Sequence, residues 1–286
     1  MNEPIRCAAV ISPAGRPEKT DLDCGIGLLR THGLEVKVMP HVYGSENSSF
    51  PYLAATDAER AMDFMQAYCD NDVDIIFASR GGYGCARMLP YLDWSKLKSC
   101  RPKIVAGYSD LTSLFFAMTV KNCGIPLASV MAAKLMDAPE NYLSSVMAAC
   151  SGKERIFELD VIKYGCCNGT VLAANLTVAA SCAGTAYMPD TSGKILVLEE
   201  VGEDLYRIDR MLNQLRLCGA LEKCSGLVGG YFSGCDTGQV KELLKTYSRY
   251  VNGPVLAGFS YGHELPFVPF LYGNSWKIDG NCLVIS

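Results

Sequence analysis

The sequence predicts an α/β protein with two domains, a doubly wound, mostly parallel sheet followed by a smaller β-rich domain. In the first half, short apolar runs alternate with segments whose apolar residues recur at helical spacing, a pattern typical of parallel sheets covered by helices. The run Val73–Ala78 is apolar on both faces, as expected of a central strand. After about residue 165, Gly, Cys, Asn and β-branched residues become frequent. We therefore expect domains over residues 1–150 and 165–286, joined by a linker over residues 151–164.

The elements of the first domain follow from periodicity and from the residues that start and end helices. A capping box at Thr56–Glu59 opens one helix, and Gly33 ends another. In order, we expect a strand over Arg6–Ile11, a helix through Leu22, Ile26 and Leu29, a strand over Leu34–Met39, a helix through Met62, Met65 and Tyr68, and the strand Val73–Ala78. This alternation is that of flavodoxin-like and amidotransferase-like folds, whose sites lie at the C-terminal ends of the strands.

The segment Lys103–Phe116 joins a further strand to a helix through a sharp corner at Ser109. An apolar run ends at Gly107, and from Asp110 onward apolar residues recur at helical spacing. A serine at such a corner holds its hydroxyl out of the sheet edge, beside helix N–H groups that can receive an oxyanion. The strict G-x-S-x-G motif is absent, and serine is also a favoured helix N-cap. This segment alone therefore leaves two roles open for Ser109, that of a nucleophile and that of a helix N-cap.

A glycine-rich loop, Ser79–Gly84, follows the strand Val73–Ala78 and precedes a helix that starts at Cys85. Glycines allow the backbone to approach a ligand closely and to point N–H groups at it. The loop lacks the G-x-G-x-x-G and G-K-S/T patterns of nucleotide sites, so a tight turn without a ligand is an equal alternative. Cys85 is a rival nucleophile, because a thiol at a helix start can have a lowered pKa. We interpret it as a packing residue.

The second domain is expected to contain several strands and one amphipathic helix. We expect a helix over Glu140–Cys150 before it, then a strand over Lys194–Leu198, a helix through Leu205, Ile208, Leu212 and Leu215, strands over Leu227–Phe232 and Val255–Phe259, and a final hairpin with a type I′ turn at Asp279–Gly280.

Composition excludes several classes of protein. The 286 residues carry a formal net charge of −4, which argues against nucleic acid or an anionic membrane as the partner. No apolar run approaches the ~18 residues that span a bilayer, and the N-terminus lacks the pattern of a signal peptide. The fourteen cysteines form no C-x-x-C pair, so we expect reduced, mostly buried thiols in a cytoplasmic protein, with no metal site.

Three histidines are the candidates for a general base. His32 lies at a helix end, where it has a structural role. His41 follows a strand, but no acid near it in the sequence suggests an orienting partner. His263 follows Gly262 at a strand end, where the glycine frees the backbone. The residues alone leave a structural role open for each histidine.

Four motifs in order resemble the serine peptidase family of the LD-carboxypeptidases (muramoyltetrapeptide carboxypeptidases) and the microcin-immunity hydrolases. The family pattern is R-G-G-Y-G, G-Y-S-D, L-E-D-V-G-E followed by Y-R-I-D-R, and a late G-H. The corresponding segments here are Arg80–Gly84, Gly107–Asp110, Leu198–Glu203 with Tyr206–Arg210, and Gly262–His263. The earlier segment Thr56–Arg60 is also similar to the family.

The resemblance implies a Ser109–His263–Glu199 triad and an acyl-enzyme intermediate. Glu199 and Glu200 alternate in direction along a strand, and the family pattern places the acid directly after the leucine, which is Glu199 here. The implied oxyanion donors are the backbone N–H of Asp110 and one from Gly81 or Gly82.

The implied reaction is hydrolysis of an L-D peptide bond, which releases terminal D-Ala from murein tetrapeptides during cell-wall recycling. Arg80, Tyr83 and Arg207 are the expected substrate-binding residues, and a free carboxylate suits either arginine. Arg207 is equally suited to a structural pair with Glu203 or Asp209. We expect no cofactor, no metal, no nucleic-acid or membrane partner, and a homodimer.

One departure from the family bears on the substrate. The family commonly has H-G-P after the strand that follows the nucleophile helix, and this chain has Ser129-Val130-Met131 there. Two alternatives therefore stay open. One is a hydrolase that detoxifies a peptidyl or acyl nucleotide antibiotic, and the other is a catalytically inactive α/β protein that binds a ligand.

Overall fold

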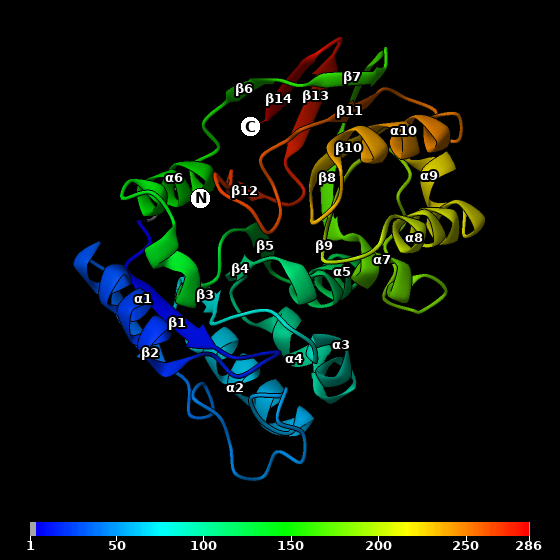
Figure 1. Cartoon of the computed structure of the whole chain (residues 1–286). Coiled ribbons are helices and arrows are strands. Elements are labelled where there is room, and N and C mark those ends of the chain that lie inside the picture. Colours follow the sequence, from blue (N-terminus) through cyan, green and yellow to red (C-terminus); the bar gives the residue numbers. More distant parts are fainter. Residues whose placement is uncertain (1–3, 286) are drawn as a thin grey trace. The chain divides into compact units, whose positions relative to one another are not determined.

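The structure, a computed structural model, describes residues 4–285. The chain divides into two compact units, the first ending at Ser151 and the second beginning at Gly152. In Figure 1 the first unit runs from blue to green and the second from green to red. The predicted α/β class with two domains is confirmed.

The first unit is built on a parallel sheet with the strand order β2-β1-β3-β4-β5. Its strands are β1 (Cys7–Ile11), β2 (Glu35–Val38), β3 (Ile75–Ala78), β4 (Ile104–Gly107) and β5 (Ile125–Ala128). Every residue of β1, β3 and β4 is buried, and of these strands β3 is the one that the sequence predicted to be central. Because the strand order reverses at β1, the loops after β1 and β3 diverge at the C-terminal ends of these strands. Such a switch point favours a binding site between the two loops.

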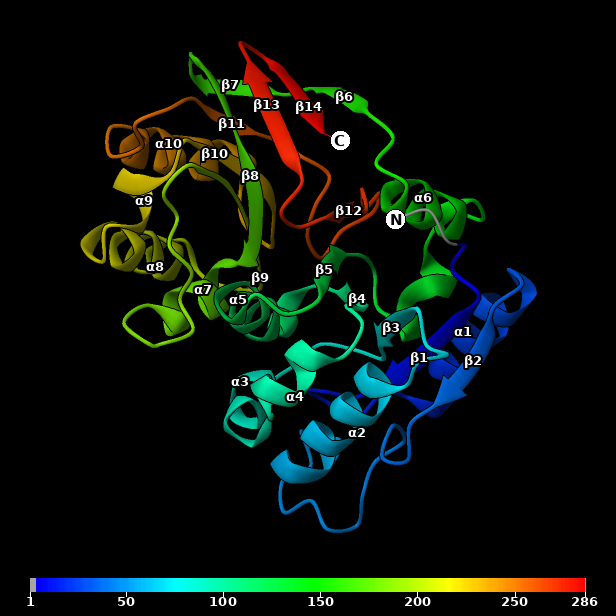
Figure 2. The ribbon, with the colours of Figure 1, turned by 180° about the vertical axis from the view of Figure 1, so that it is seen from behind.

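Helices cover both faces of this sheet. They are α1 (Lys19–Thr31), α2 (Asp57–Cys69), α3 (Cys85–Met88), α4 (Trp94–Ser99), α5 (Thr112–Lys121) and α6 (Tyr142–Cys150), with 3-10 turns η1 (Leu89–Tyr91), η2 (Ser109–Leu111) and η3 (Ala132–Asp137). Figures 1 and 2 show α1 on one side of the sheet and α2 and α4 on the other, as right-handed crossovers require. The predicted capping box of α2 is confirmed, with Thr56 Oγ1 accepting from the Glu59 N–H and Glu59 accepting from the Thr56 N–H.

The second unit is built on a mixed sheet. Its elements are β6 (Arg155–Glu158), β7 (Asp160–Lys163), β8 (Cys166–Asn175), α7 (Leu176–Cys182), β9 (Lys194–Val201), α8 (Leu205–Leu217), α9 (Ala220–Lys223), β10 (Gly226–Ser233), α10 (Thr237–Ser248), β11 (Val255–Ala257), β12 (Phe270–Leu271), β13 (Ser275–Asp279) and β14 (Cys282–Ile285). Strands β8 to β11 are parallel neighbours, and antiparallel strands extend the sheet at both ends. Figure 2 shows the red hairpin of β13 and β14 beside β8. The apolar face predicted for α8 is confirmed, since Ile208, Leu212 and Leu215 are buried.

The segment expected to be a linker, residues 151–164, contains two strands of this sheet. Strand β6 pairs with β14, and β7 pairs with β11. Phe157 of β6 also packs edge-on against Phe259, with 5.4 Å between ring centroids. The segment therefore belongs to the second unit. Local patterning did not reveal this, because the partners of these strands lie about a hundred residues further along the chain.

The C-terminal hairpin is present, but its turn is shifted by one residue from the prediction. Asp279 pairs with Cys282, so the two-residue loop is Gly280–Asn281. Gly280 has φ +61°. A type I′ turn needs positive φ at both loop positions, and Asn281 is not among the described residues with positive φ.

The cysteines are free thiols, although fewer are buried than expected. Six are buried (Cys7, Cys85, Cys123, Cys150, Cys182 and Cys224), and the other eight are partly or fully exposed. The prediction that most are buried is therefore wrong. Within residues 4–285, no helix has both the length and the apolar character needed to cross a bilayer.

The close packing of α1 on η3 leads to a stability prediction with an internal control. A Cβ at Gly25 would lie 1.9 Å from the carbonyl oxygen of Ala132, whereas a Cβ at Gly27 would meet no atom within 4 Å. We expect Gly25→Ala to lower the free energy of unfolding by about 1–3 kcal/mol or more through overpacking. Gly27→Ala should instead raise it by about 0.4–1 kcal/mol, because alanine restricts the unfolded chain. Urea unfolding of the two variants checks this, and equal effects would contradict the packing.

Candidate active site

Ser109 occupies a strained corner between β4 and η2. Its φ of +60° lies in the left-handed region, and Asn122 is the one other non-glycine residue there among residues 4–285. A non-glycine residue in this region costs on the order of 1–3 kcal/mol, and such residues cluster at functional sites. The N-cap position of η2 is Tyr108, and that of α5 is Leu111. Ser109 therefore occupies the N-cap position of neither helix.

The glycine-rich loop after β3 passes directly over this corner. A Cβ at Gly81 would lie 3.1 Å from the Ser109 Oγ and 3.2 Å from its Cβ, so any side chain at residue 81 would crowd the hydroxyl. Gly82 and Gly84 have φ values of +111° and +135°, which side-chain-bearing residues rarely adopt. The loop thus requires glycine both for its conformation and for its approach to Ser109.

Asp110 links the serine corner to the glycine loop. Its buried carboxylate accepts a hydrogen bond of 2.8 Å from the backbone N–H of Cys85. Burial raises the pKa of Asp110, and the Cys85 N–H opposes that shift. The carboxylate therefore anchors the start of α3, while the backbone N–H of the same residue lies next to Ser109 in the chain.

Cys85 itself is fully buried, and burial raises the pKa of its thiol well above the ordinary value. The thiolate is the reactive form of cysteine. This environment disfavours it, so the structure supports packing as the role of Cys85.

A buried arginine, which the sequence analysis did not single out for a role, holds the loops at this edge together. The guanidinium of Arg60 donates to the carbonyl oxygens of Pro13, Gly84 (2.8 Å) and Ala55 (3.2 Å), and it pairs with Asp57. It thereby ties the loops after β1, β2 and β3 to the start of α2. The only sequence signal for this role was the position of Arg60 in the capping-box segment.

Arg80 and Tyr83 extend from the glycine loop into solvent. The Arg80 Nη1 donates to the Arg16 carbonyl oxygen at 3.2 Å, and Arg80 takes part in no ion pair within the part of the chain that the structure describes. Tyr83 is half exposed. Both side chains are therefore accessible to a ligand.

In the second unit, His263 and Glu199 form a hydrogen-bonded pair. The His263 Nδ1 lies 2.8 Å from the Glu199 Oε2, and Glu199 is 0% exposed at the end of β9. Burial raises the pKa of Glu199, and the hydrogen bond to His263 opposes this shift. A Cβ at Gly262, where φ is +134°, would lie 2.9 Å from the Glu199 Oε2. Glycine before the histidine is therefore what allows the two side chains to meet.

Asn175 and Glu200 complete this cluster. Asn175 stands opposite Glu199 in the parallel pairing of β8 and β9, and its Nδ2 donates to both glutamates at 3.1 Å. The Glu200 carboxylate accepts from the backbone N–H of Thr177 (2.7 Å) and of Val201 (2.9 Å). Glu200 thus stabilises the start of α7, whereas Glu199 is hydrogen-bonded to His263. The sequence analysis gave Asn175 no role.

Arg207 lies at the exposed first turn of α8. Its guanidinium pairs with Glu203 at 3.2 Å and donates to the Tyr206 hydroxyl at 3.0 Å. Asp209 instead accepts from the hydroxyl of Tyr247. Of the two structural pairs that the sequence left open, the structure contains the one with Glu203.

His41 has an acidic partner that no residue near it in the sequence suggested. Its Nδ1 lies 2.8 Å from Asp63 Oδ1, and its backbone N–H donates to the same carboxylate. Asp63 is on α2, 22 residues away, so local sequence gave no signal. His41 follows β2, and β1 and β3 separate β2 from β4. At about 4.8 Å per strand, this puts the end of β2 about 14 Å from the end of β4, too far for His41 to contact Ser109.

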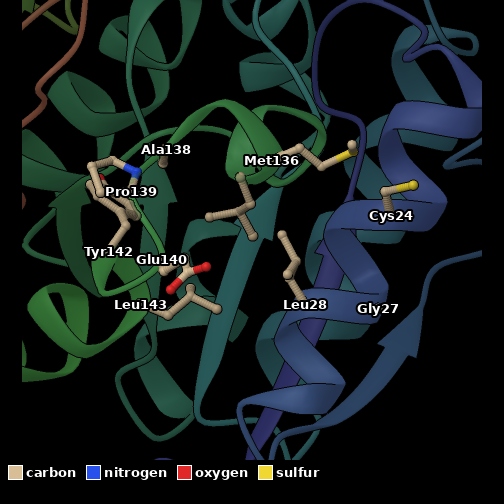
Figure 3. Close-up of a pocket in the computed structure, with 10 residues that line it drawn as sticks. Cys24, Gly27, Leu28, Met136, Ala138, Pro139, Glu140, Tyr142 and Leu143 are labelled. Carbon is tan, nitrogen blue, oxygen red and sulfur yellow. The ribbon is translucent and has the colours of Figure 1, made fainter.

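A separate open cavity of about 440 Å³ lies between α1 and the segment from η3 to α6. Figure 3 shows Leu28, Met136 and Leu143 around it. Its lining, within the part of the chain described by the structure, includes none of the predicted site residues.

The burial of Cys85 leads to a labelling prediction. Iodoacetamide at neutral pH should modify Cys24, which is exposed on α1, at least about tenfold faster than Cys85, because the reaction needs an accessible thiolate. Peptide mass spectrometry of the folded protein after timed quenching measures both rates. Equal rates would show that the thiol of Cys85 is accessible and would reopen it as a nucleophile.

Two family descriptions match the chain, the LD-carboxypeptidase N-terminal domain over residues 8–129 and the LD-carboxypeptidase C-terminal domain over residues 168–278. A protein of Streptomyces coelicolor is 33% identical over 267 residues, which cover 89% of this chain and 84% of that protein. The murein tetrapeptide carboxypeptidase of Pseudomonas aeruginosa is 29% identical over 293 residues, which cover 96% of this chain and 94% of that enzyme.

Solved structures agree with these matches. The muramoyltetrapeptide carboxypeptidase of Oxalobacter formigenes has a TM-score of 0.85 at 29% identity, with 98% of each chain covered. The microcin C7 self immunity protein MccF in its wild type apo state has a TM-score of 0.87 at 20% identity, with 99% of this chain and 96% of that chain covered. At that identity the second likeness shows the fold alone. The resemblance predicted from the motifs is confirmed, and the chain belongs to the LD-carboxypeptidase family of serine-type peptidases.

Proposed function

We propose that this protein hydrolyses an L-D peptide bond and releases the terminal D-Ala of murein tetrapeptides, with Ser109, His263 and Glu199 as a catalytic triad. The observation that carries the proposal is the hydrogen bond of 2.8 Å between His263 and the buried Glu199. A buried carboxylate on Nδ1 leaves Nε2 as the basic nitrogen and stabilises the imidazolium. The strained, non-capping conformation of Ser109 supports its role as the nucleophile.

In the proposed acylation step, the Ser109 Oγ attacks the carbonyl carbon of the scissile bond while the His263 Nε2 takes its proton. The backbone N–H of Asp110 and an N–H of the Gly81–Gly82 loop stabilise the oxyanion, each worth about 3 kcal/mol in comparable sites. His263 then gives the proton to the leaving amine, and D-Ala departs. The product is an ester between Ser109 and the shortened peptide.

In the proposed deacylation step, His263 takes a proton from water, whose oxygen attacks the carbonyl carbon of the ester. His263 then returns the proton to the Ser109 Oγ as the ester bond breaks, and the shortened peptide leaves with a free carboxyl group. Glu199 keeps its negative charge in both steps, because its role is to orient and stabilise the imidazolium. The chemistry as proposed needs only these side chains and the backbone donors.

Arg80 is the residue that we propose for binding the terminal carboxylate of the substrate. It neighbours Gly81, is exposed, and lacks a carboxylate partner among residues 4–285, so it is available for a bidentate pair. Arg207 is engaged with Glu203 and Tyr206, which favours the structural role for it. Tyr83 is proposed to contact the peptide next to Arg80.

We further propose that the protein is a cytoplasmic homodimer. Its substrates would be murein tetrapeptides that are recycled from the cell wall. Fourteen cysteines without a disulfide are typical of proteins in a reducing compartment. The homodimer stays a prediction that sedimentation in solution can check.

The first test is a paired digestion. We expect the wild-type protein to release D-Ala from a murein tetrapeptide, and Ser109→Ala to keep less than about a thousandth of kcat, because removal of a triad nucleophile can cost on the order of 10⁶-fold in kcat. Circular dichroism of the variant controls for its fold. A peptidyl-adenylate analogue is digested in parallel. Cleavage of the analogue alone would favour a detoxifying hydrolase, and cleavage of neither substrate would favour an inactive ligand-binding protein.

The second test separates the two adjacent glutamates. Glu199→Gln should lower kcat by about 10⁴-fold, because a neutral amide cannot stabilise the imidazolium. Glu200→Gln should change kcat little. It should lower the free energy of unfolding by about 1–3 kcal/mol, because its NH₂ group would face a backbone N–H in place of an acceptor. The opposite pattern of activities would move the catalytic acid to Glu200.

A further inference from the structure

Two thiols of the first unit, those of Cys69 and Cys100, lie in contact. Cys69 is the last residue of α2 and Cys100 directly follows α4, so the two are 31 positions apart in the chain. Their Sγ atoms are 2.8 Å apart. A disulfide bond is about 2.05 Å long, so an approach of about 0.8 Å, which small side-chain rotations supply, converts the contact into a bond. We call these two residues the thiol pair.

The backbone that follows each cysteine is clamped to that of the other. Cys69 is followed by the loop 70–74, and Cys100 is followed by Arg101 and Lys103. The buried ammonium of Lys103 donates to two carbonyl oxygens of this loop, at 2.5 and 2.6 Å. The guanidinium of Arg101 donates to two of its carbonyl oxygens, at 2.8 and 3.1 Å, and to one of its carboxylates, at 2.9 Å. The contact of the thiol pair is therefore maintained by the fold.

The surroundings assign the two thiols different roles in an oxidation. Burial raises the pKa of Cys69 to about 11, and its neighbour Cys100 adds to this shift. Cys69 therefore keeps its proton at neutral pH and can donate a hydrogen bond to a thiolate at Cys100. The ammonium of Lys103 also interacts with Cys100, and a nearby cation favours a thiolate. Cys100 is thus the thiol suited to attack an oxidant first.

Small molecules can reach the thiol pair. Both of its side chains are partly exposed, and Cys69 lines an open cavity of about 450 Å³ beside α2, together with Lys96 of α4. A third thiol, that of Cys123, is near enough to contribute to the pKa of Cys69. It is buried and donates to the Tyr68 hydroxyl at 3.4 Å. The thiol pair therefore combines contact between the sulfur atoms with access from solvent.

We propose that Cys69 and Cys100 form a reversible disulfide when the protein meets a peroxide. The Cys100 thiolate attacks one oxygen of hydrogen peroxide, the O–O bond breaks, and a sulfenic acid forms. The leaving hydroxide takes up the proton that Cys100 had released and departs as water. The Cys69 sulfur then attacks the Cys100 sulfur, the S–O bond breaks, and the hydroxyl departs as a second water with the Cys69 proton. The two thiols are oxidised and the peroxide is reduced. A small dithiol reverses the reaction by thiol–disulfide exchange.

The proposed disulfide stabilises the first unit and does not contact the candidate active site. The thiol pair precedes β3 and β4, whereas the glycine loop and Ser109 follow them. Each of these strands has four residues, which span about 13 Å. The cross-link closes a loop of about 30 residues and thereby restricts the unfolded chain. Both the cross-link and the stabilisation are independent of the proposed hydrolase activity.

The experiment treats the reduced protein with hydrogen peroxide, blocks the remaining thiols with N-ethylmaleimide and digests the protein without reductant. We expect peptide mass spectrometry to find a peptide cross-linked between Cys69 and Cys100, which dithiothreitol cleaves. The Tm measured without reductant should rise by about 5–10 °C over that of the reduced protein. Cys100→Ser should abolish both the cross-linked peptide and the rise. Cys123→Ser is the matched control, because it removes the buried thiol beside the pair, and it should retain both.

The cross-linked peptide is measured in the wild type and needs no variant. Its absence after treatment with excess peroxide, or a cross-link that joins Cys69 to Cys123 instead, would overturn the thiol pair. A cross-link without a rise in Tm, or an equal rise in Cys100→Ser, would contradict the stabilising role. If Cys100→Ser does not fold, Cys69→Ser provides the same comparison, since the disulfide needs both sulfur atoms.

Discussion

The hydrogen bond between His263 and Glu199 sets the requirements that the second unit has to meet. A carboxylate with no exposed surface favours its neutral form, since burial raises its pKa. Hydrogen-bond donors must therefore offset the effect of burial if the Glu199 carboxylate is to carry a charge. His263 and Asn175 supply these donors. The parallel pairing of β8 with β9 puts Asn175 opposite Glu199, and Gly262 lets the histidine approach. Glu200, one residue further, has the separate task of accepting backbone N–H groups, so two adjacent acids differ in role because their partners differ.

The first unit meets a different constraint, which is to hold a strained serine under a loop of glycines. The positive φ of Ser109 costs free energy, and the surrounding contacts have to maintain it. Asp110 anchors the start of α3, and Arg60 ties together the loops that follow three parallel strands. Asp57, the carboxylate partner of Arg60, also pairs with Arg87. A buried arginine with carbonyl and carboxylate partners is costly to disrupt, because its unpaired charge would remain in the interior.

The features that sequence reasoning predicted are those whose causes are local. The apolar run before Gly107 and the helical spacing after Asp110 placed a corner at Ser109, and Thr56 with Glu59 placed a helix start. The pairing of His41 with Asp63 and the support given by Asn175 join segments that only the fold brings together, so no local pattern contained them. The same reason explains the strands in the expected linker. Motif order predicted the family, which no single motif could have done.

The central claim is that His263, from the second unit, activates Ser109, from the first. The most direct measurement is the rate at which a fluorophosphonate labels Ser109, located by peptide mass spectrometry, in the wild type and in His263→Ala. The wild type should be labelled at Ser109, because a histidine that accepts the serine proton makes the hydroxyl a stronger nucleophile. The variant should react at least about a hundredfold more slowly. Labelling of His263→Ala at the wild-type rate, or of a residue other than Ser109, would contradict the claim.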